Sequence, residues 1–330
     1  MPETVPPLPE RAEAWSAYWA SGALHSCATS FSGNYAGALA AFWRTVFDGL
    51  PEAARVLDLC CGNAPLSKLL LDAPQHKQVA RLDAVDLADI APPWVAGLNA
   101  ETASRLHVHA RADASALPFS DAQFDLCMSQ YGIEYAGAAA FREAARVLRP
   151  GGRLAAVLHH VESLPVRMAK VELDHIDWLL ASSDIYLCAG AMIEPMARTS
   201  TDAGRAQLKH DATANLARAS FNNALQVLSA RIQAAPLPDV LIEQRQWLMK
   251  LLGDTPRIGA ETARAMLDSL LNATRASRLR QQEVIQYACD EAQVRALAAC
   301  LGDPAPMISM LRFDNGEIAG FGLVATRAAT

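Results

Sequence analysis

The chain of 330 residues has no hydrophobic run that approaches the ~20 residues a membrane-spanning helix needs. Its first ten residues are rich in proline, contain Glu3 and Glu10, and show no basic segment before an apolar one, so we expect no secretory signal. The seven cysteines do not follow the spacing of a disulfide framework. Scattered cysteines of this kind are typical of reduced thiols, so we expect a cytoplasmic protein that does not contact membranes.

Metal-binding and nucleic-acid-binding patterns are also missing. No Cys/His grouping has zinc spacing, and His107 and His109, which alternate on an expected strand, have no further ligand nearby in the sequence, so we predict no metal site. The formal net charge is −6 and no basic stripe is present, so we do not expect nucleic-acid binding. Hydrophobic residues make up 52% of the chain, which is enough for a substantial core in one large domain or two.

What is present is a hydrophobic segment that runs into a turn of small residues. Residues 56–64, VLDLCCGNA, predict a buried strand and a tight turn, and residues 66–71 predict a helix. Small residues at such a turn let a ligand approach the backbone, and the start of the helix presents N–H groups to it. Asp58 lies near the end of the strand, where a carboxylate can accept hydrogen bonds from a ligand.

Two more acids follow segments that we predict as strands. Residues 82–86, LDAVD, end in Asp86, which we prefer over Asp83 and Asp89 as an acceptor for ribose hydroxyls. A solvated acid at the strand end is the alternative. Asp113 opens the segment DASALPF, and a further strand is expected over residues 124–129.

These blocks resemble, in order, the motifs of the class I S-adenosylmethionine-dependent methyltransferases of the type 11 kind. The first resembles acid-x-(Gly or Cys)-x-Gly-x-Gly, with Ala64 in place of the last glycine and Pro65 after it. Residues 112–125 resemble the family's acid-Ala-x-x-Leu-Pro-Phe block. Residues 141–154, FREAARVLRPGGRL, resemble its helix, Pro-Gly-Gly turn and fifth strand, with Gly151 and Gly152 expected to reverse the chain at positive φ.

The resemblance covers roughly residues 52–160 and implies an α/β fold with a Rossmann-like, seven-stranded sheet. It implies S-adenosylmethionine as cofactor and S-adenosylhomocysteine as product. By resemblance, Asp113 receives the adenine amino group and Ala114 supplies a backbone N–H to the ring. The expected cofactor-binding residues are Asp58, Cys60, Gly62, Asn63, Asp86, Leu87, Asp113, Ala114 and Gln130.

We divide the chain into four parts. Residues 1–50 form a helical N-terminal cap with an aromatic stripe, residues 51–160 the cofactor-binding core, and residues 161–302 a helical insertion. Residues 303–330 form a β-hairpin around Asp314-Asn315-Gly316 that completes the sheet. The insertion is expected to build a lid over the substrate or a homodimer interface. Its helices are expected over 201–234, 240–252 with a stop at 253–256, 261–280, 283–289 and 291–301.

The aromatic stripe has two interpretations, core packing or a cover for the ligands. In the second, the acceptor contacts Tyr18, Trp19, Tyr35 and Tyr135, and the loop 26–35 acts as a lid. Candidates for a general base lie where the fourth and fifth strands end. They are Tyr131, Glu134, His159 and His160, with His25 as a weaker one, and the alternative for the histidines is a structural role.

The acceptor is less constrained than the cofactor. Family members that methylate bases or glutamine amides often carry (Asn/Asp/Ser)-Pro-Pro-(Tyr/Phe) after the fourth strand, and residues 129–135 read SQYGIEY instead. No acidic cluster supports a magnesium-dependent mechanism. We therefore expect methyl transfer to oxygen or nitrogen of a small molecule. The alternatives are a protein or RNA methyltransferase that docks through the insertion, and an inactive cofactor-binding or assembly protein.

Overall fold

The computed structural model describes residues 7–26 and 33–329, and its contacts divide the chain into two units. The sheet unit comprises Met1–Arg167 and Glu283–Thr330. The helical unit comprises Met168–Gln282, a narrower range than the 161–302 expected for the insertion. The difference arises because the helix after residue 290 packs on the sheet.

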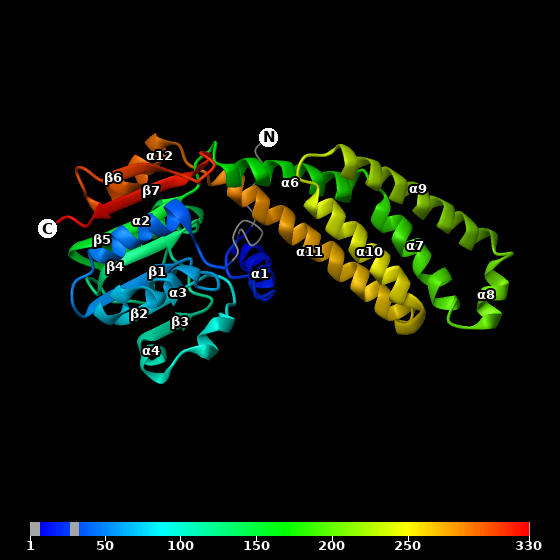
Figure 1. The fold of residues 1–330 in the computed structure, drawn as a ribbon, viewed down its shortest axis with the longest axis horizontal. Helices are drawn as coiled ribbons and strands as arrows, with labels where there is room; N and C mark the ends of the chain where they lie inside the picture. Colours follow the sequence, from blue (N-terminus) through cyan, green and yellow to red (C-terminus); the bar gives the residue numbers. More distant parts are fainter. Residues whose placement is uncertain (1–6, 27–32, 330) are drawn as a thin grey trace. The chain divides into compact units, whose positions relative to one another are not determined.

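The sheet unit is built on one seven-stranded sheet in the order β3-β2-β1-β4-β5-β7-β6 (Figure 1). The strands are β1 (Ala54–Leu59), β2 (Val79–Val85), β3 (Leu106–His109), β4 (Phe124–Gln130), β5 (Leu148–Leu158), β6 (Met307–Arg312) and β7 (Ile318–Thr326). β1 to β5 pair in parallel, whereas β7 runs antiparallel to both β5 and β6. The predicted seven-stranded α/β sheet with a late hairpin is confirmed.

Helices cover both faces of this sheet, so its central strands bury hydrophobic side chains on both sides. Side chains alternate along β1, so Val56 faces α2 (Gly37–Asp48) and α3 (Pro65–Asp72). Its neighbour Leu57 faces the opposite layer, made by α5 (Gly137–Val147) and α12 (Glu291–Ala298). The remaining short helices of this unit are α1 (Leu8–Trp19), α4 (Ala100–Arg105), η1 (Pro74–Gln78), η2 (Pro93–Gly97), η3 (Ile133–Ala136) and η4 (Ala299–Leu301).

The helical unit has a core of its own, to which Ile193, Leu228, Leu241 and Leu248 belong. Its helices are α6 (Leu164–Ala181), α7 (Ile185–Arg198), α8 (Asp202–Leu208), α9 (Ala212–Ala234), α10 (Asp239–Ile258) and α11 (Ala260–Gln286). In the described residues no single helix is long and apolar enough to cross a membrane, although α6 and α7, bent by 50° at their junction, pass that test as a pair.

Three of the helix predictions in this region are wrong. The helix expected over 201–234 is divided into α8 and α9, and the Asp211 side chain caps the start of α9 by accepting from the Ala214 amide. α10 continues through residues 253–256 and stops at Gly259, whose φ is +83°. Pro256 lies in the last turn, where its missing N–H forfeits only the bond to the Leu252 carbonyl. The helices expected over 261–280 and 283–289 form the single helix α11, because no proline or glycine interrupts residues 260–286.

The Pro-Gly-Gly segment also differs from expectation. Gly151 has the predicted positive φ of +78°, but Gly152 does not. The segment lies inside β5 instead of before it, as an outward bulge between the pairs Phe124–Leu148 and Leu126–Arg153. A Cβ on Gly152 would lie 2.8 Å from the Arg149 carbonyl oxygen, so close backbone packing explains this glycine.

Candidate active site

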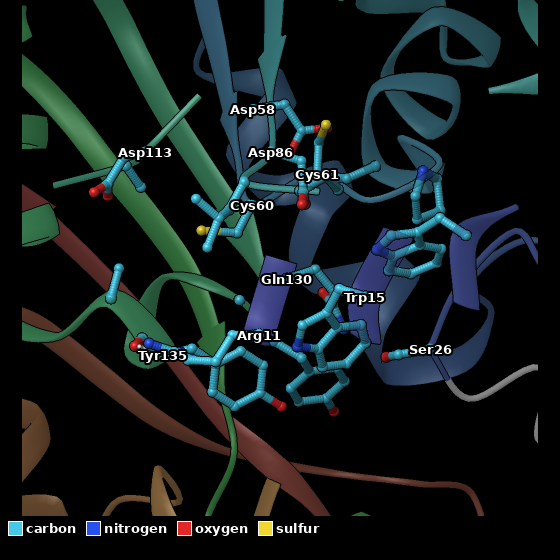
Figure 2. A pocket seen from close by; sticks show the side chains of 18 of the residues that line it. Arg11, Trp15, Ser26, Asp58, Cys60, Cys61, Asp86, Asp113, Gln130 and Tyr135 are labelled. Atoms are coloured by element: carbon cyan, nitrogen blue, oxygen red, sulfur yellow. Dashed lines mark hydrogen bonds between the residues drawn. The ribbon is translucent and has the colours of Figure 1, made fainter. Parts of the chain in front are cut away.

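A cavity of about 860 Å³, counted with part of the solvent at its mouth, opens at the carboxyl ends of β1, β2 and β4 (Figure 2). Open parallel sheets place their ligands at this edge. One group of lining residues follows the strands and comprises Asp58, Cys60, Cys61, Pro65, Leu66, Asp86, Leu87, Asp113, Ala114, Gln130, Tyr131, Gly132, Tyr135 and Ala136. A second group comes from the N-terminal segment and comprises Leu8, Arg11, Trp15, Trp19, Ser26 and Tyr35.

Asp58 is held rigidly at the end of β1. Its Oδ2 accepts hydrogen bonds from the backbone N–H and the hydroxyl of Ser67, at 3.0 and 2.7 Å. Its Oδ1 is buried and has no partner among the described residues. Burial raises the pKa of Asp58 to about 7, because the hydrogen bonds from Ser67 offset only part of the desolvation of the carboxylate.

Three residues of the turn after β1 adopt the left-handed backbone conformation, with φ of +54° at Cys60, +54° at Gly62 and +53° at Ala64. Ala64 is therefore the strained substitute for the family's last glycine. Pro65 opens α3, where a proline is tolerated because its absent N–H would have no partner in the helix. The Ala64-Pro65 departure thus leaves the strand–turn–helix geometry intact.

Asp86 connects the end of β2 to this turn. Its Oδ2 accepts from the Gly62 amide at 2.7 Å, and its Oδ1 accepts from the Ala88 amide at 2.8 Å. Burial raises the pKa of Asp86, and these two bonds counteract the rise. Each carboxylate oxygen has a second lone pair, so Asp86 still has capacity for hydroxyl donors of a ligand.

Asp113 and Gln130 are each oriented by one neighbour. The hydroxyl and backbone N–H of Ser115 donate to Asp113 Oδ1, at 2.7 and 2.8 Å. The Trp43 indole N–H donates to Gln130 Oε1 at 2.6 Å, which fixes the amide so that its Nε2 is the free donor. That Nε2 is buried without a partner among the described residues.

The N-terminal wall of the cavity is fastened by Glu283 near the end of α11. Arg11 Nε donates to Glu283 Oε1, and the Trp15 indole N–H donates to Oε2 at 2.7 Å. Arg11 Nη2 also donates to the Tyr135 carbonyl at 3.0 Å, and its guanidinium lies 5.3 Å from the Tyr287 ring centroid. The Arg11 and Glu283 side chains are 11% and 2% exposed, so this is a buried ion pair.

Several residues expected in the site do not line the cavity. A Cβ on Gly62 would lie 2.3 Å from the Trp19 ring, so this ring covers the turn. Asn63 instead fastens the end of α1, since its Nδ2 donates to the carbonyls of Trp19 and Ala23 at 2.9 and 2.7 Å. Tyr18 donates from its hydroxyl to the His25 carbonyl at 3.0 Å. Within the expected lid loop, residues 27–32 lie outside the described residues.

The expected catalytic residues separate into two groups. Glu134 Oε1 accepts from the backbone N–H and the Nδ1 of His159, at 3.0 and 2.8 Å, and both side chains are buried. The His159 ring packs between Tyr131 and Tyr135, with centroids 4.4 and 5.9 Å away, and these tyrosines line the cavity although His159 and Glu134 do not. The other group is His160, which packs on Phe321 at 4.7 Å and accepts from the Glu162 amide.

The sequence did not reveal Arg11 or Glu283 as site residues, whereas Trp15 belongs to the aromatic stripe that was expected to pack in the core or cover the ligands. Arg11 and Trp15 are four apart on one helix face, which is a usable signal for a common neighbour. Their partner Glu283 is 272 residues from Arg11 and sits in a helix of interspersed charges, so no local pattern distinguishes it.

The unpartnered atoms of the cavity fit S-adenosylmethionine. Asp58 Oδ1 is a buried acceptor and Gln130 Nε2 a buried donor, and buried polar groups normally have partners. The ammonium and hydroxyl groups of the cofactor can donate, and its carboxylate can accept. The acids of the lining also suit a ligand that carries a sulfonium charge.

Comparison with known proteins agrees with this geometry. Residues 56–152 match the family model described as a methyltransferase domain. The chain is 33% identical over 119 residues to malonyl-[acyl-carrier protein] O-methyltransferase of Pseudescherichia vulneris, covering 36% of this chain and 43% of that protein. It is 35% identical over 142 residues to 2-phytyl-1,4-naphtoquinone methyltransferase of Synechococcus elongatus, covering 41% and 58%.

The chain spans about half the length of these curated relatives. Among solved structures, an S-adenosylmethionine-dependent methyltransferase from Mesorhizobium loti has 24% identity and a TM-score of 0.31, covering 40% of this chain and 59% of that one.

The sheet order, the strand-end site and the family match define a methyltransferase domain of the Rossmann-like kind. Residues 56–152 match a methyltransferase domain, and the curated relatives that share this part of the chain are methyltransferases.

Proposed function

We propose that this chain transfers a methyl group from S-adenosylmethionine to an oxygen or nitrogen of a small, partly apolar molecule. The observation that carries the proposal is the cavity itself, in which strand-end acids and aromatic side chains of α1 line one space. When bound, the cofactor supplies an electrophilic methyl group on its sulfonium sulfur. The residues of the chain then bind, align and exclude water, which are the main requirements of an in-line displacement.

The acids hold the cofactor in this proposal. Asp58 receives the ammonium group, Asp86 the ribose hydroxyls and Asp113 the adenine amino group. Leu87, Cys60 and the backbone of Ala114 pack against the nucleoside, and Gln130 donates to the carboxylate. Support comes from the positions of these residues at the ends of successive parallel strands.

The aromatic residues form the acceptor side. Trp15, Trp19, Tyr131 and Tyr135 line the cavity with apolar ring surface. Trp15 packs against both Trp19 and Tyr135, with centroids 5.9 and 6.0 Å apart. Such a wall excludes water and orients a flat acceptor by its faces.

His159 is the residue we propose as general base, in preference to His160. The Glu134 carboxylate can only accept, so Nδ1 of His159 carries the proton and Nε2 is the basic nitrogen. Neither histidine lines the cavity, but the His159 ring contacts the lining residues Tyr131 and Tyr135. His160 instead packs on Phe321 and accepts from the Glu162 amide, so we assign it no role in transfer.

The quinone relative supports a small acceptor, since it is a 2-phytyl-1,4-naphtoquinone methyltransferase, and the other relative is a malonyl-[acyl-carrier protein] O-methyltransferase. We further propose a cytoplasmic protein with reduced thiols, in agreement with the described cysteines being free. Nucleic acid is not an expected partner, because the cavity lining carries three aspartates and one arginine.

We propose that the helices between β5 and β6 are an insertion that covers the acceptor or mediates self-association. Sedimentation of the full chain tests the second role, and a monomer at all concentrations would remove it. Docking of a protein or RNA through these helices is the alternative function.

The function is tested with radiolabelled S-adenosylmethionine and a panel of phenols, hydroxynaphthalenes and aromatic amines. We expect label in an extractable small molecule. Label that appears only in added protein or RNA would contradict the proposal and favour the alternative.

A further inference from the structure

We propose that the buried pair Arg11–Glu283 makes the acceptor side of the cavity charge-neutral and so selects uncharged planar acceptors over carboxylated ones. This inference rests on the proposed function, because it names the acceptor class for the same cavity. It assigns specificity to two residues that lie far apart in the sequence.

Of the lining residues that the structure describes, Arg11 alone is cationic. Its Nε donates to Glu283, its Nη2 donates to the Tyr135 carbonyl, and its guanidinium packs near the Tyr287 ring. Arg11 therefore presents a donor surface whose net charge Glu283 cancels (Figure 2 shows Arg11 beside Tyr135 and Trp15).

A carboxylated acceptor would meet a guanidinium that is already paired. To pair with Arg11 it must share the guanidinium with Glu283 or displace it, and the Glu283 side chain is only 2% exposed. Removing the partner of a buried carboxylate is strongly unfavourable because water cannot replace it. The remaining charged residues of the lining, Asp58, Asp86 and Asp113, repel an anion when they are ionised.

Stacked aromatic rings shape the acceptor side of the cavity. Trp15 stacks on Tyr135 with an interplanar angle of 29° and on Trp19 with an angle of 21°. Stacked rings present flat apolar faces, and the Trp15 N–H is already bound to Glu283. A planar ring with a neutral oxygen suits this wall, because the oxygen can accept from Arg11 without disturbing the ion pair.

The experiment compares two probes with the same fused ring, 2-naphthol and 6-hydroxy-2-naphthoate. Binding of each is measured by quenching of tryptophan fluorescence, with and without saturating S-adenosylhomocysteine. We expect the wild-type protein to bind 2-naphthol at least about tenfold more tightly.

Glu283→Gln should invert this preference. The amide keeps an acceptor for Arg11 and removes the negative charge, so the carboxylate probe should gain roughly tenfold or more in affinity. Arg11→Met should weaken binding of the carboxylate probe further, because this variant leaves the negative charge of Glu283 unpaired. The double variant should return to a preference for 2-naphthol.

Glu317→Gln is the matched control. Glu317 also pairs with an arginine of the sheet unit, Arg167, but both side chains are more than 40% exposed and neither lines the cavity. It removes the same charge and should leave the probe ratio unchanged.

Equal binding of the two probes to the wild type would overturn the inference, as would an unchanged ratio in both Glu283→Gln and Arg11→Met. If Glu283→Gln fails to fold, Arg11→Met alone decides the question. Failure of S-adenosylhomocysteine to bind the wild type would instead overturn the proposed function, and the probe titrations without it distinguish the two outcomes.

Discussion

The Asp86 carboxylate accepts a hydrogen bond from the Gly62 amide at 2.7 Å, which connects the end of β2 to the turn after β1. The same carboxylate lines the cavity. One side chain thus serves both the shape of the turn and the proposed contact with the ribose. Variants in this region must therefore be compared with controls that separate stability from binding.

Gly62→Ala should destabilise the protein by roughly 2–5 kcal/mol, from left-handed strain and overpacking together. The added Cβ would lie 2.3 Å from the Trp19 ring, at a residue with φ of +54°. Gly316→Ala is the control, because Gly316 also has positive φ but has open space around it. Denaturant unfolding should give a smaller loss for the control, about 1–2 kcal/mol. Equal losses would show that Trp19 does not press on the turn.

Asp58→Asn should change the pH dependence of stability. Burial raises the folded-state pKa of Asp58 to about 7 from an ordinary value of 3.8. The folded state therefore holds a proton that the unfolded state releases, and the stability from this group is lost as the pH rises from about 4 through 7. Asp58→Asn has no carboxylate to ionise, so its free energy of unfolding should not fall over this pH range. The difference in stability between variant and wild type should therefore shift in favour of the variant at pH 8, by on the order of 1 kcal/mol or more.

Asp83→Asn is the control of opposite sign. Burial alone would raise the pKa of Asp83, but hydrogen bonds from Arg81 and His109 outweigh it and lower the pKa. The stabilisation of the folded state by ionised Asp83 is present above the pKa that this group has in the unfolded chain, and it is lost as the pH falls through the lower folded-state pKa. Thermal unfolding from about pH 3 to 8 measures both variants, because the Asp83 contribution is lost only as the pH falls below the ordinary value of 3.8. Parallel profiles for Asp58→Asn and wild type would contradict the burial argument.

His159→Ala should lower the methylation rate by roughly 10²–10⁴-fold if His159 is the base, with cofactor affinity near normal. His160→Ala should retain the rate. If both histidine variants keep the full rate, transfer depends on alignment alone and neither histidine is a base.

Much of the sheet unit could be predicted from the sequence, because its signals are local. The acids Asp58, Asp86 and Asp113 each follow a hydrophobic strand, and the Asn-Gly turn between apolar runs marks the hairpin. The cavity lining includes all three acids. Parallel strands that end at one edge convert such separate patterns into a common site.

The parts that the sequence did not reveal depend on contacts between distant segments. Glu283 anchors Arg11 and Trp15 across more than 260 residues. Trp19 covers Gly62, and Asn63 binds the end of α1 instead of facing the cavity. The end of α10 was predicted at residues 253–256, but the helix continues to Ile258. A proline in the last turn removes only one backbone hydrogen bond, so it does not end the helix.

The central claim is tested most directly by calorimetric titration of S-adenosylhomocysteine into wild type, Asp86→Ala and Asp83→Ala. Asp83 lies on β2, three residues before Asp86, and is also a buried, hydrogen-bonded carboxylate, but it does not line the cavity. We predict saturable binding to the wild type, a loss of roughly 1–3 kcal/mol in Asp86→Ala, and near-normal affinity in folded Asp83→Ala. Absence of binding to the wild type, or equal affinity in all three proteins, would contradict the account.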